Sequence, residues 1–345
     1  MPSQFSVPCH AAEKLLYSRV ETNPSRPPRS LRRVIRYGFS AFAALVIAQA
    51  HADLFVSSQL GSAGGTILRY NQADGSFAGV FASVGGSADP LGLTFGPNGN
   101  LYVACGNANG VRRYDGRTAA FLGVFAFGVS GPMNMKFGPD GNLYVSSSSS
   151  QILRYDGRTG AFMDAFISDT RLDYPRGLTF GPDGDLYVVS YNQATVLRYS
   201  AAGTFLGTFV PSRSGGLFAP SDLVFGPDGN LYVTGGNSAA GVLRYNGNTG
   251  AFMGQFASVG PNAPIDLAYG PDGNLYVTVQ GATEGVLRFN GQTGALIDNF
   301  VASNSGGLGG PFGLAFSPVP EPSTFRAARR CRWFSPGPPL ETSTV

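Results

Sequence analysis

Short apolar stretches separated by turns that contain Gly or Pro extend from residue 53 to residue 318. Within residues 175–209, the stretches GLTF, DLYVVS, TVLRYS and TFLGTF predict four short strands. Pro182-Asp183-Gly184 predicts the turn between the first two, because Pro presets φ and both Asp and Gly accept turn geometry. Apolar residues fall on both sides of these strands, which indicates a small sheet that neighbouring elements cover on both faces.

The same unit recurs along the chain. GPDGNLYV occurs at 138–145, 226–233 and 270–277, and near copies occur at 96–103 and 181–188. One aromatic position marks the six units: Phe55, Tyr102, Tyr144, Tyr187, Tyr232 and Tyr276. Successive members are 47, 42, 43, 45 and 44 residues apart. A period in the forties with four strands per unit is typical of β-propeller blades.

The two ends of this repeat region complement each other. The first unit begins at its second strand, residues 54–56, and the last segment, 311–318, is a lone first strand. Pairing of the two completes one blade and removes an open sheet edge. We therefore predict an all-β domain over residues 53–318. It is a six-bladed β-propeller with four antiparallel strands per blade, closed by a C-terminal strand that completes the first blade.

The repeat resembles the NHL family. The shared features are a Pro-x-Gly strand start, a PDG turn, an L/I-Y-V strand and a V-x-x-[YF]-D-x-x-G segment, and they extend over residues 53–318. The resemblance implies a six-bladed propeller of the superfamily that includes lactonases and streptogramin lyases. It leaves the function open, because similar propellers include lyases, lactonases, receptors and scaffolds.

The residues before the repeat carry an export pattern. The basic segment RSLRRVIRYG precedes an apolar run at 39–50, and AHA follows. This order predicts a signal peptide within an N-terminal extension, residues 1–52, with cleavage after Ala52. The run is shorter than the roughly 20 apolar residues that span a bilayer. The pair Arg32–Arg33 weakly resembles a twin-arginine signal, but we favour the general secretory route. Either route predicts a location in the cell envelope, in the periplasm or outside the cell.

The residues after the repeat, 319–345, begin with VPEPST. This motif, with Pro320, Glu321 and Pro322, resembles the PEP-CTERM signal of proteins that exosortase processes. In that family an apolar helix and a basic cluster follow the motif, whereas here an Arg- and Pro-rich segment follows at once. We expect a disordered tail whose anchor was lost by a frameshift, and a chance match is the alternative. The resemblance implies exosortase as a partner of an intact tail, with delivery to the envelope or matrix.

Charge is distributed unevenly and narrows the range of partners. The net charge is +3, with 24 Lys and Arg against 21 Asp and Glu. Residues 53–318 hold 13 of the former and 17 of the latter, so the predicted propeller has a net charge of −4. A mildly acidic body lacks the basic surface of a nucleic-acid binder, so we expect no nucleic-acid partner, and we expect a monomer. Cys9, Cys105 and Cys331 are too few and too scattered for a disulfide framework or a thiolate metal site.

Residues for general acid–base catalysis are scarce. His10 and His51 lie before the expected cleavage point, and residues 53–318 hold one lysine, Lys136, and one glutamate, Glu284. Catalysis near neutral pH would therefore need an Asp or Glu whose pKa is strongly shifted. The similar streptogramin-type and peptide-amidating lyases rely on histidine, which the predicted propeller lacks. We predict no catalytic residues and favour a protein that is not an enzyme.

The best metal hypothesis concerns the start of the innermost strands. The positions two residues after each blade's proline are Gly92, Asn134, Gly177, Asp222, Asp266 and Gly313. Innermost strands line the axial channel, so Asn134, Asp222 and Asp266 could converge at its mouth and bind a divalent cation together with water. Such a site would suit the alternative function, a metal-dependent lactonase or lyase. The competing interpretation is that these residues cap strand ends and bond to loop backbone.

The resemblance to lactonases argues against that metal site. In that family the metal-binding Asn and Asp directly follow the proline. The residues at these positions here are Leu91, Met133, Arg176, Ser221, Ile265 and Phe312. Most of them cannot ligate a cation, so we predict no cofactor and keep a divalent cation as the alternative.

Two recurring charged positions have structural interpretations. The turn aspartates lie one per blade, too far apart for the six to eight oxygens of a calcium site, so we expect them to shape their turns. They are Asp140, Asp183, Asp228 and Asp272. We expect the arginines of the third strands to form hydrogen bonds or ion pairs between blades, with turn aspartates or carbonyls as partners, rather than a polyanion-binding ring. They are Arg69, Arg113, Arg154, Arg198, Arg244 and Arg288.

Loop variation indicates where a ligand would bind. The GPDGN and D/N-G-x-T-G turns repeat closely and are expected at one end of the ring, whereas the two loop sets at the other end vary in length and content. Loops without a structural duty can specialise, although neutral drift gives the same pattern. The predicted ligand-face residues are Tyr174, Tyr191, Arg171, Arg213 and Phe218. We predict a binding or scaffold module for a polysaccharide or surface protein, and an inert structural filler is the remaining alternative.

Overall fold

The computed structural model describes residues 52–59, 65–85, 88–235 and 241–318. The predicted export signal, apart from Ala52, and the predicted sorting motif at 319–345 lie outside the described residues. The described part consists of strands, their connections and two short 3-10 helices, η1 (Ser214–Gly216) and η2 (Ser305–Gly307). No helix within these four ranges is long and apolar enough to cross a membrane.

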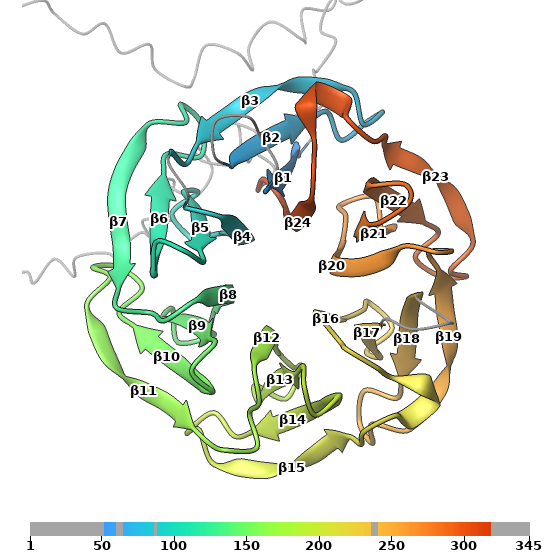
Figure 1. The fold of residues 1–345 in the computed structure, drawn as a ribbon. Helices are drawn as coiled ribbons and strands as arrows, with labels where there is room; N and C mark the ends of the chain where they lie inside the picture. The colour runs from blue at the N-terminus through green and yellow to red at the C-terminus, as the bar shows by residue number, and fades with distance from the viewer. Residues whose placement is uncertain (1–51, 60–64, 86–87, 236–240, 319–345) are drawn as a thin grey trace, which may run out of the picture. The chain divides into compact units, whose positions relative to one another are not determined.

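Six four-stranded antiparallel sheets surround a central axis (Figure 1). From the innermost to the outermost strand, blade 1 contains β24 (Pro311–Phe316), β1 (Leu54–Ser58), β2 (Thr66–Tyr70) and β3 (Phe77–Ser83). Blade 2 contains β4 (Pro90–Phe95), β5 (Leu101–Cys105), β6 (Gly110–Tyr114) and β7 (Phe121–Phe127). Blade 3 contains β8 (Pro132–Phe137), β9 (Leu143–Ser147), β10 (Gln151–Tyr155) and β11 (Phe162–Ser168).

The other three blades follow the same order. Blade 4 contains β12 (Pro175–Phe180), β13 (Leu186–Ser190), β14 (Thr195–Tyr199) and β15 (Phe205–Val210). Blade 5 contains β16 (Leu223–Phe225), β17 (Leu231–Gly235), β18 (Gly241–Tyr245) and β19 (Phe252–Ser258). Blade 6 contains β20 (Ala263–Tyr269), β21 (Leu275–Gln280), β22 (Gly285–Phe289) and β23 (Leu296–Val301).

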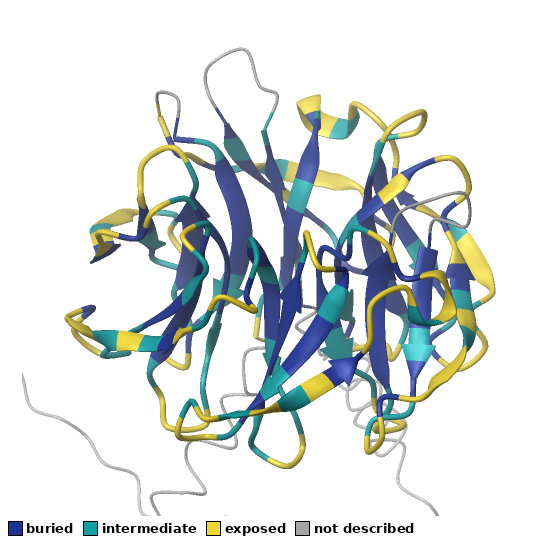
Figure 2. Ribbon diagram, turned by 60° about the horizontal axis from the view of Figure 1, so that its bottom comes forward, coloured by how far each residue is buried: buried dark blue, intermediate teal, exposed yellow. Residues whose placement is uncertain are grey.

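The predicted six-bladed propeller is confirmed, and so is its closure. β24 pairs antiparallel with β1, with Leu54 opposite Phe316 and Val56 opposite Leu314. The last described strand, β24, is therefore the innermost strand of the blade that begins with β1 (Figure 1). The second strands of the blades are buried along their whole length in β1, β5, β9, β13 and β17. Exposed residues lie in the turns, in the loops and on the outermost strands, such as β3 and β11 (Figure 2).

One aromatic residue in the second strand of each blade links that blade to the next. In blade 3, the Tyr144 ring meets Phe166 of the same blade edge-on at a centroid distance of 4.9 Å, and Phe180 of blade 4 at 5.1 Å. The other blades repeat this arrangement around Phe55, Tyr102, Tyr187, Tyr232 and Tyr276. Edge-to-face pairs add about 0.5–1.5 kcal/mol beyond burial, so this position stabilises the contacts between blades.

The turn aspartates have the structural role that the sequence predicted. Asp140 Oδ1 accepts a hydrogen bond from the backbone N–H of Asn142 at 3.0 Å, and its Oδ2 accepts one from the Tyr144 hydroxyl at 2.9 Å. The equivalent bonds recur at Asp183, Asp228 and Asp272. Each carboxylate therefore joins its turn to the aromatic contact between blades.

The prediction for the recurring arginines was wrong about where their partners lie. Arg154 pairs with Asp164, directly opposite on the outermost strand of its own blade. Arg198 pairs with the turn aspartate Asp183 at 2.7 Å, again within one blade. Residues directly opposite on neighbouring strands project from the same face of the sheet, so Arg154 meets the side chain of Asp164 within its own blade.

The repeated turns and the variable loops lie at opposite ends of the ring, as predicted. At the turn end, Gly157 N–H of one repeated turn donates to Asn142 Oδ1 of the other at 3.4 Å. At the variable-loop end, the loop before β12 meets the loop after β13, where Tyr191 N–H donates to the Tyr174 carbonyl at 3.3 Å. One end of the ring therefore consists of nearly identical turns, and the other consists of loops that differ from blade to blade.

Candidate functional site

A bulge near the start of the innermost strands positions the three candidate metal residues. The pairing of β8 with β9 shifts register around Asn134, whose backbone N–H donates to the Ser146 hydroxyl at 3.0 Å. Asp222 and Asp266 hold the equivalent positions in blades 5 and 6, and their N–H groups donate to threonine hydroxyls of the second strands at 2.8 and 2.9 Å. A bulge redirects a side chain, and a hydroxyl from the next strand satisfies the amide that the bulge leaves unpaired.

The structure brings Asn134, Asp222 and Asp266 together, and we call these three residues the acid cluster. Asn134 Nδ2 donates to Asp222 Oδ1 at 3.1 Å, and the Asp266 carboxyl lies close enough to that of Asp222 to raise its pKa. All three are buried, with relative exposures of 6%, 1% and 5%. Gly177 of β12 lies between Asn134 and Asp222 in chain order, and a Cβ added to it would lie 2.2 Å from Asp222 Oδ1. The contact across blade 4 therefore requires glycine.

The oxygens of the acid cluster are already bonded within the propeller. Asp266 Oδ2 accepts a bond from Leu314 N–H at 3.1 Å, and Asn134 Oδ1 accepts one from Met135 N–H at 2.7 Å. These partners are backbone groups of the innermost strands rather than of loops. Within the described ranges, no third Asp, Glu, His or Cys joins the two carboxyls. Two carboxyls and one amide fall short of the six to eight oxygens of a calcium site. The divalent-cation hypothesis stays a prediction.

Burial raises the pKa of Asp222 well above its ordinary value of 3.8. The negative charge of Asp266 and the hydrogen bond to it add to this effect, whereas the positive charge of Lys136 opposes it. Asp222 therefore stays protonated to higher pH than an exposed carboxyl. A group with 1% exposure is also closed to a substrate, so this carboxyl is poorly placed for general base catalysis.

A second group of side chains surrounds Arg176, which directly precedes Gly177 and lies closer to the variable loops than the acid cluster does. The guanidinium of Arg176, in β12, stacks on Tyr191 at 3.8 Å from the ring centroid and lies 5.5 Å from the centroid of Tyr174. Arg176 Nη1 donates to Ser221 Oγ at 3.3 Å. We call Arg176, Tyr174, Tyr191 and Ser221 the loop-end cluster. It joins the inner part of blades 4 and 5 to the two loops that meet above them.

Arg176 has no negatively charged partner in the part of the chain that the structure describes. Its Nε is buried without an acceptor there, and none of the ion pairs of that part includes Arg176. Burial lowers the pKa of the guanidinium, an effect that Tyr191 and Tyr174 offset only in part. An arginine keeps its charge in proteins even so. The loop-end cluster therefore holds an uncompensated positive charge.

The five predicted ligand-face residues have different surroundings. Tyr174 and Tyr191 lie together, with ring centroids 6.0 Å apart. Arg171 stacks on Phe205 at 3.9 Å and pairs with Asp169 at 2.9 Å, so its charge is already compensated.

Arg213 and Phe218 flank η1 in the connection from β15 to β16. η1 packs against β19, the outermost strand of blade 5. Phe218 is 47% exposed. Of the five predicted residues, the structure thus groups Tyr174 and Tyr191 with Arg176, and it gives Arg171, Arg213 and Phe218 other neighbours.

Arg176 and Ser221 were missed as ligand-face residues. Their position after the blade proline was weighed only as a cation ligand, a role that an arginine cannot fill. The sequence did contain a signal, because four of the other five blades have an apolar residue there: Leu91, Met133, Ile265 and Phe312.

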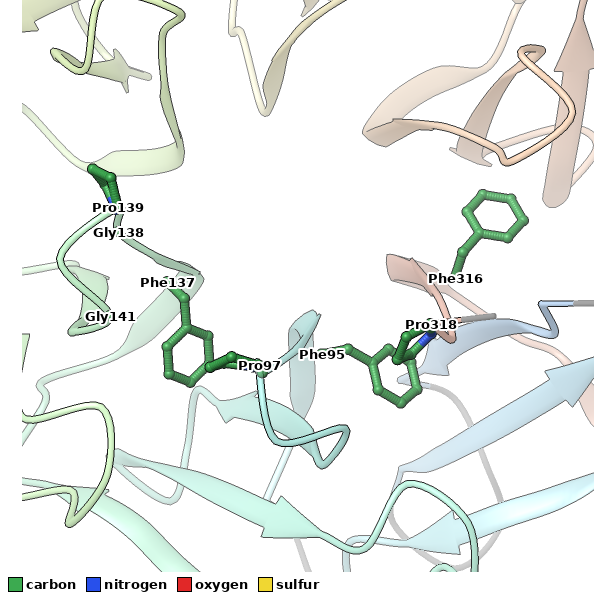
Figure 3. A pocket seen from close by; sticks show the side chains of 9 residues that line it. Phe95, Pro97, Phe137, Gly138, Pro139, Gly141, Phe316 and Pro318 are labelled. Atoms are coloured by element: carbon green, nitrogen blue, oxygen red, sulfur yellow. The ribbon is translucent and has the colours of Figure 1, made fainter. Parts of the chain in front are cut away.

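A cavity of about 490 Å³ lies at the turn end (Figure 3). Its lining residues are Phe95, Gly96, Pro97, Phe137, Gly138, Pro139, Gly141, Phe316 and Pro318. The phenylalanines are the last residues of innermost strands, and the prolines belong to the segments that follow. This lining has no polar side chain to orient a ligand, so the loop-end cluster is the better candidate for a binding site.

No protein-family model and no curated protein sequence matches this chain. Solved structures match its fold, among them a chain of a crystallised nidogen–laminin complex, with a TM-score of 0.60, 16% identity and coverage of 78% of this chain and 99% of that chain. A protein of unknown function from Bacteroides caccae gives a TM-score of 0.62, 13% identity and coverage of 77% and 99%. The propeller fold is shared.

A putative gluconolactonase extends the range of these neighbours, with a TM-score of 0.52, 17% identity and coverage of 62% of this chain and 78% of that chain. A streptogramin B lyase is a further structural neighbour. The neighbours thus include both enzymes and a chain from a protein complex, so likeness of fold does not select a function.

Proposed function

We propose that this protein is an exported propeller that acts as a binding module, with its ligand face at the variable-loop end. The observation that carries the proposal is the pair of tyrosines, Tyr174 and Tyr191, from two different loops, which lie together beside a half-buried arginine. Aromatic side chains with a polar tip provide rigid contact area for a ligand. The scaffold below them is made of strands, which hold such a site more rigidly than loops alone.

Binding is favoured over catalysis by the chemistry of the propeller's side chains. Residues 53–318 contain no histidine. The carboxyl whose pKa is clearly raised, Asp222, is buried in the acid cluster and bonded to its neighbours. A metal-dependent lactonase or lyase is the alternative proposal, and it needs the acid cluster to bind a divalent cation. Calcium, magnesium, manganese or zinc would then raise the Tm of the protein, because binding to the folded state stabilises it.

The proposed location is the cell surface or the extracellular matrix. The support is the sequence pattern at 39–52 and the VPEPST motif. Because of that motif we also propose exosortase as a partner of an intact tail. The ligand partner that we propose is a polysaccharide, with a surface protein as the second possibility, and we propose a monomer. Cell fractionation tests the location, and recovery of the protein in the cytoplasm alone would contradict it.

Affinity electrophoresis against a panel of neutral and acidic polysaccharides tests the binding function. We expect at least one polysaccharide to retard the protein and the double variant Tyr174→Ala/Tyr191→Ala to lose that retardation, by about tenfold in affinity or more. Phe162→Ala is the matched control, because this aromatic residue is 58% exposed on the outermost strand of blade 3. A loss caused by Phe162→Ala and not by the tyrosine variant would contradict the proposed face.

A further inference from the structure

Arg176 departs from the pattern of its own repeat. The other blades have Leu91, Met133, Ser221, Ile265 and Phe312 at this position, so the fold accepts an uncharged residue there. Arg176 is half-buried, and a charge removed from water without a partner of opposite charge destabilises the folded state. Stacking on Tyr191 and the bond to Ser221 offset part of this cost, but an uncharged residue would avoid the cost altogether.

Tyr174 is a second departure, two residues earlier. The residue before the blade proline has a positive φ in five blades: Asp89, Gly131, Tyr174, Ala219 and Gly310. Glycine adopts this conformation freely, whereas a bulky residue such as Tyr174, with φ of 57°, is strained. Strained residues of this kind concentrate at functional sites. Two residues that are unfavourable at their positions, Arg176 and Tyr174, thus lie next to Pro175 in one blade.

The surroundings of Arg176 have a polar side and an apolar side. The polar side is the Ser221 hydroxyl, which accepts a bond from the guanidinium. The apolar side consists of the Tyr191 and Tyr174 rings, and Tyr174 in turn packs against a buried cluster that contains Met133. A single positive charge beside two tyrosine rings suits a ligand that combines a carboxylate with the apolar face of a ring. A sugar acid has this combination.

We propose that the loop-end cluster binds a carboxylate of an acidic polysaccharide, with Arg176 as the anchor and the two tyrosines as the surface on which the sugar ring packs. The proposal rests on the proposed binding function and names the ligand class for that site. A guanidinium matches a carboxylate with two parallel hydrogen bonds, which a lysine cannot reproduce. The Ser221 hydroxyl and the Tyr191 ring hold the guanidinium in place before the ligand arrives, which favours binding.

Tetragalacturonate is the probe, and its fully methyl-esterified form is a neutral control of the same length. Isothermal titration of the full chain with each probe compares the unaltered protein with Arg176→Gln, Arg176→Lys and Arg244→Gln. Arg244, on the third strand of blade 5, is the matched control. Its Nε also lacks an acceptor among the described residues, and its guanidinium lies 5.8 Å from the centroid of the Phe256 ring.

We expect tetragalacturonate to bind the unaltered protein and Arg244→Gln equally. Arg176→Gln weakens this binding at least tenfold, Arg176→Lys weakens it less, and the methyl ester binds the unaltered protein at least tenfold more weakly. We also expect the Tm of Arg176→Gln to stay the same or rise, because the substitution removes an unpaired charge. Loss of binding in this variant is then not a loss of folding.

Equal affinities of the unaltered protein and Arg176→Gln, or of the acid and its methyl ester, would overturn the inference. The proposed binding function survives that result, because the tyrosine variants test the ligand face independently of carboxylate recognition. If the unaltered protein binds neither probe, the inference is also overturned. The polysaccharide panel then decides the proposed function separately.

Discussion

A buried carboxyl next to a second carboxyl, as in Asp222 and Asp266, holds its proton to higher pH than an exposed one. The folded state then binds more protons than the unfolded state between the two pKa values of Asp222. Its contribution to stability is fully present below the unfolded pKa, near 3.8, and is lost as the pH rises through the raised pKa of the folded state. The acid cluster should therefore favour the folded propeller in mildly acidic solution.

Asp222→Asn replaces the Asp222 carboxyl by an amide that is neutral at every pH. We expect the variant to exceed the unaltered protein in stability by about 1–3 kcal/mol at alkaline pH, and the difference to vanish near the unfolded pKa of an aspartate, about 4. Urea unfolding at both pH values measures this.

Asp228→Asn is the control of opposite sign for this pH series. The pKa of Asp228 is lowered, because hydrogen bonds from Asn230 and Tyr232 outweigh desolvation. Its removal should therefore cost stability at neutral pH and little in acid. A larger stability deficit of Asp222→Asn at alkaline than at acid pH would contradict the raised pKa of Asp222.

Gly177 tests how tightly the innermost strands pack. A Cβ at this position would lie 2.2 Å from Asp222 Oδ1 and 2.6 Å from Asp222 Cα, and the latter cannot move without its strand. We expect Gly177→Ala to lower the free energy of unfolding by about 2–4 kcal/mol.

Gly235→Ala is the matched control for Gly177→Ala. The nearest atom to a Cβ there is the Leu217 Cδ1 at 3.4 Å, an ordinary contact. We expect a change within about 1 kcal/mol, measured by urea unfolding like the first variant. Equal effects of the two substitutions would show that contact with the acid cluster is not what excludes a side chain at 177.

Among the residues of the candidate site, some contacts could be predicted from the sequence and others could not. The meeting of Asn134, Asp222 and Asp266 followed from their equivalent places in a repeat around an axis. The isolation of Arg176 did not, because the absence of a carboxylate near a guanidinium depends on side chains from several blades. Its sequence signal was a charge at an otherwise mostly apolar position.

Each blade is an element that the sequence predicts almost completely. Every unit must cover its neighbours in the same way, so the strands, the PDG turn and the central aromatic residue recur with a recognisable period. Partners that occur in only some blades do not produce a periodic pattern. Asp164 and Asp298 pair with the third-strand arginine in blades 3 and 6, but the other blades have no acidic residue at this position. This explains why the within-blade ion pairs were missed.

Tyr144 allows the hydroxyl and the ring of the central aromatic residue to be separated. Tyr144→Phe removes the hydroxyl that donates to Asp140 and should lower the free energy of unfolding by about 1 kcal/mol. Tyr144→Ala also removes both edge-to-face contacts and should cost about 3–5 kcal/mol. Phe55 of blade 1 packs without a hydroxyl, which supports the milder effect of the first variant. Equal losses in urea unfolding would assign the contribution to the hydroxyl instead.

For the whole molecule, β24 is the strand on which ring closure depends. It pairs with β1, and Phe316 packs edge-on against Tyr276 of blade 6 at 4.9 Å. We expect a chain that ends after residue 310 to lose cooperative thermal unfolding, because β1 becomes an open edge and blade 6 loses its neighbour. A chain that ends after residue 318 is the control and should keep it. Circular dichroism during heating compares the two, and identical transitions would show that closure contributes little.

The same pairing has a consequence for the order of events during synthesis. Gly313 N–H donates to the hydroxyl of Ser57, 256 residues away in the chain. Ribosomes release β1 early, but the strand that completes its sheet is the last of the propeller to emerge, so blade 1 must wait for nearly the whole chain. Contacts of such long sequence separation form slowly. A nascent chain cannot close its ring until residues 311–316 have been synthesised, so β1 keeps an unpaired edge throughout translation of the other five blades.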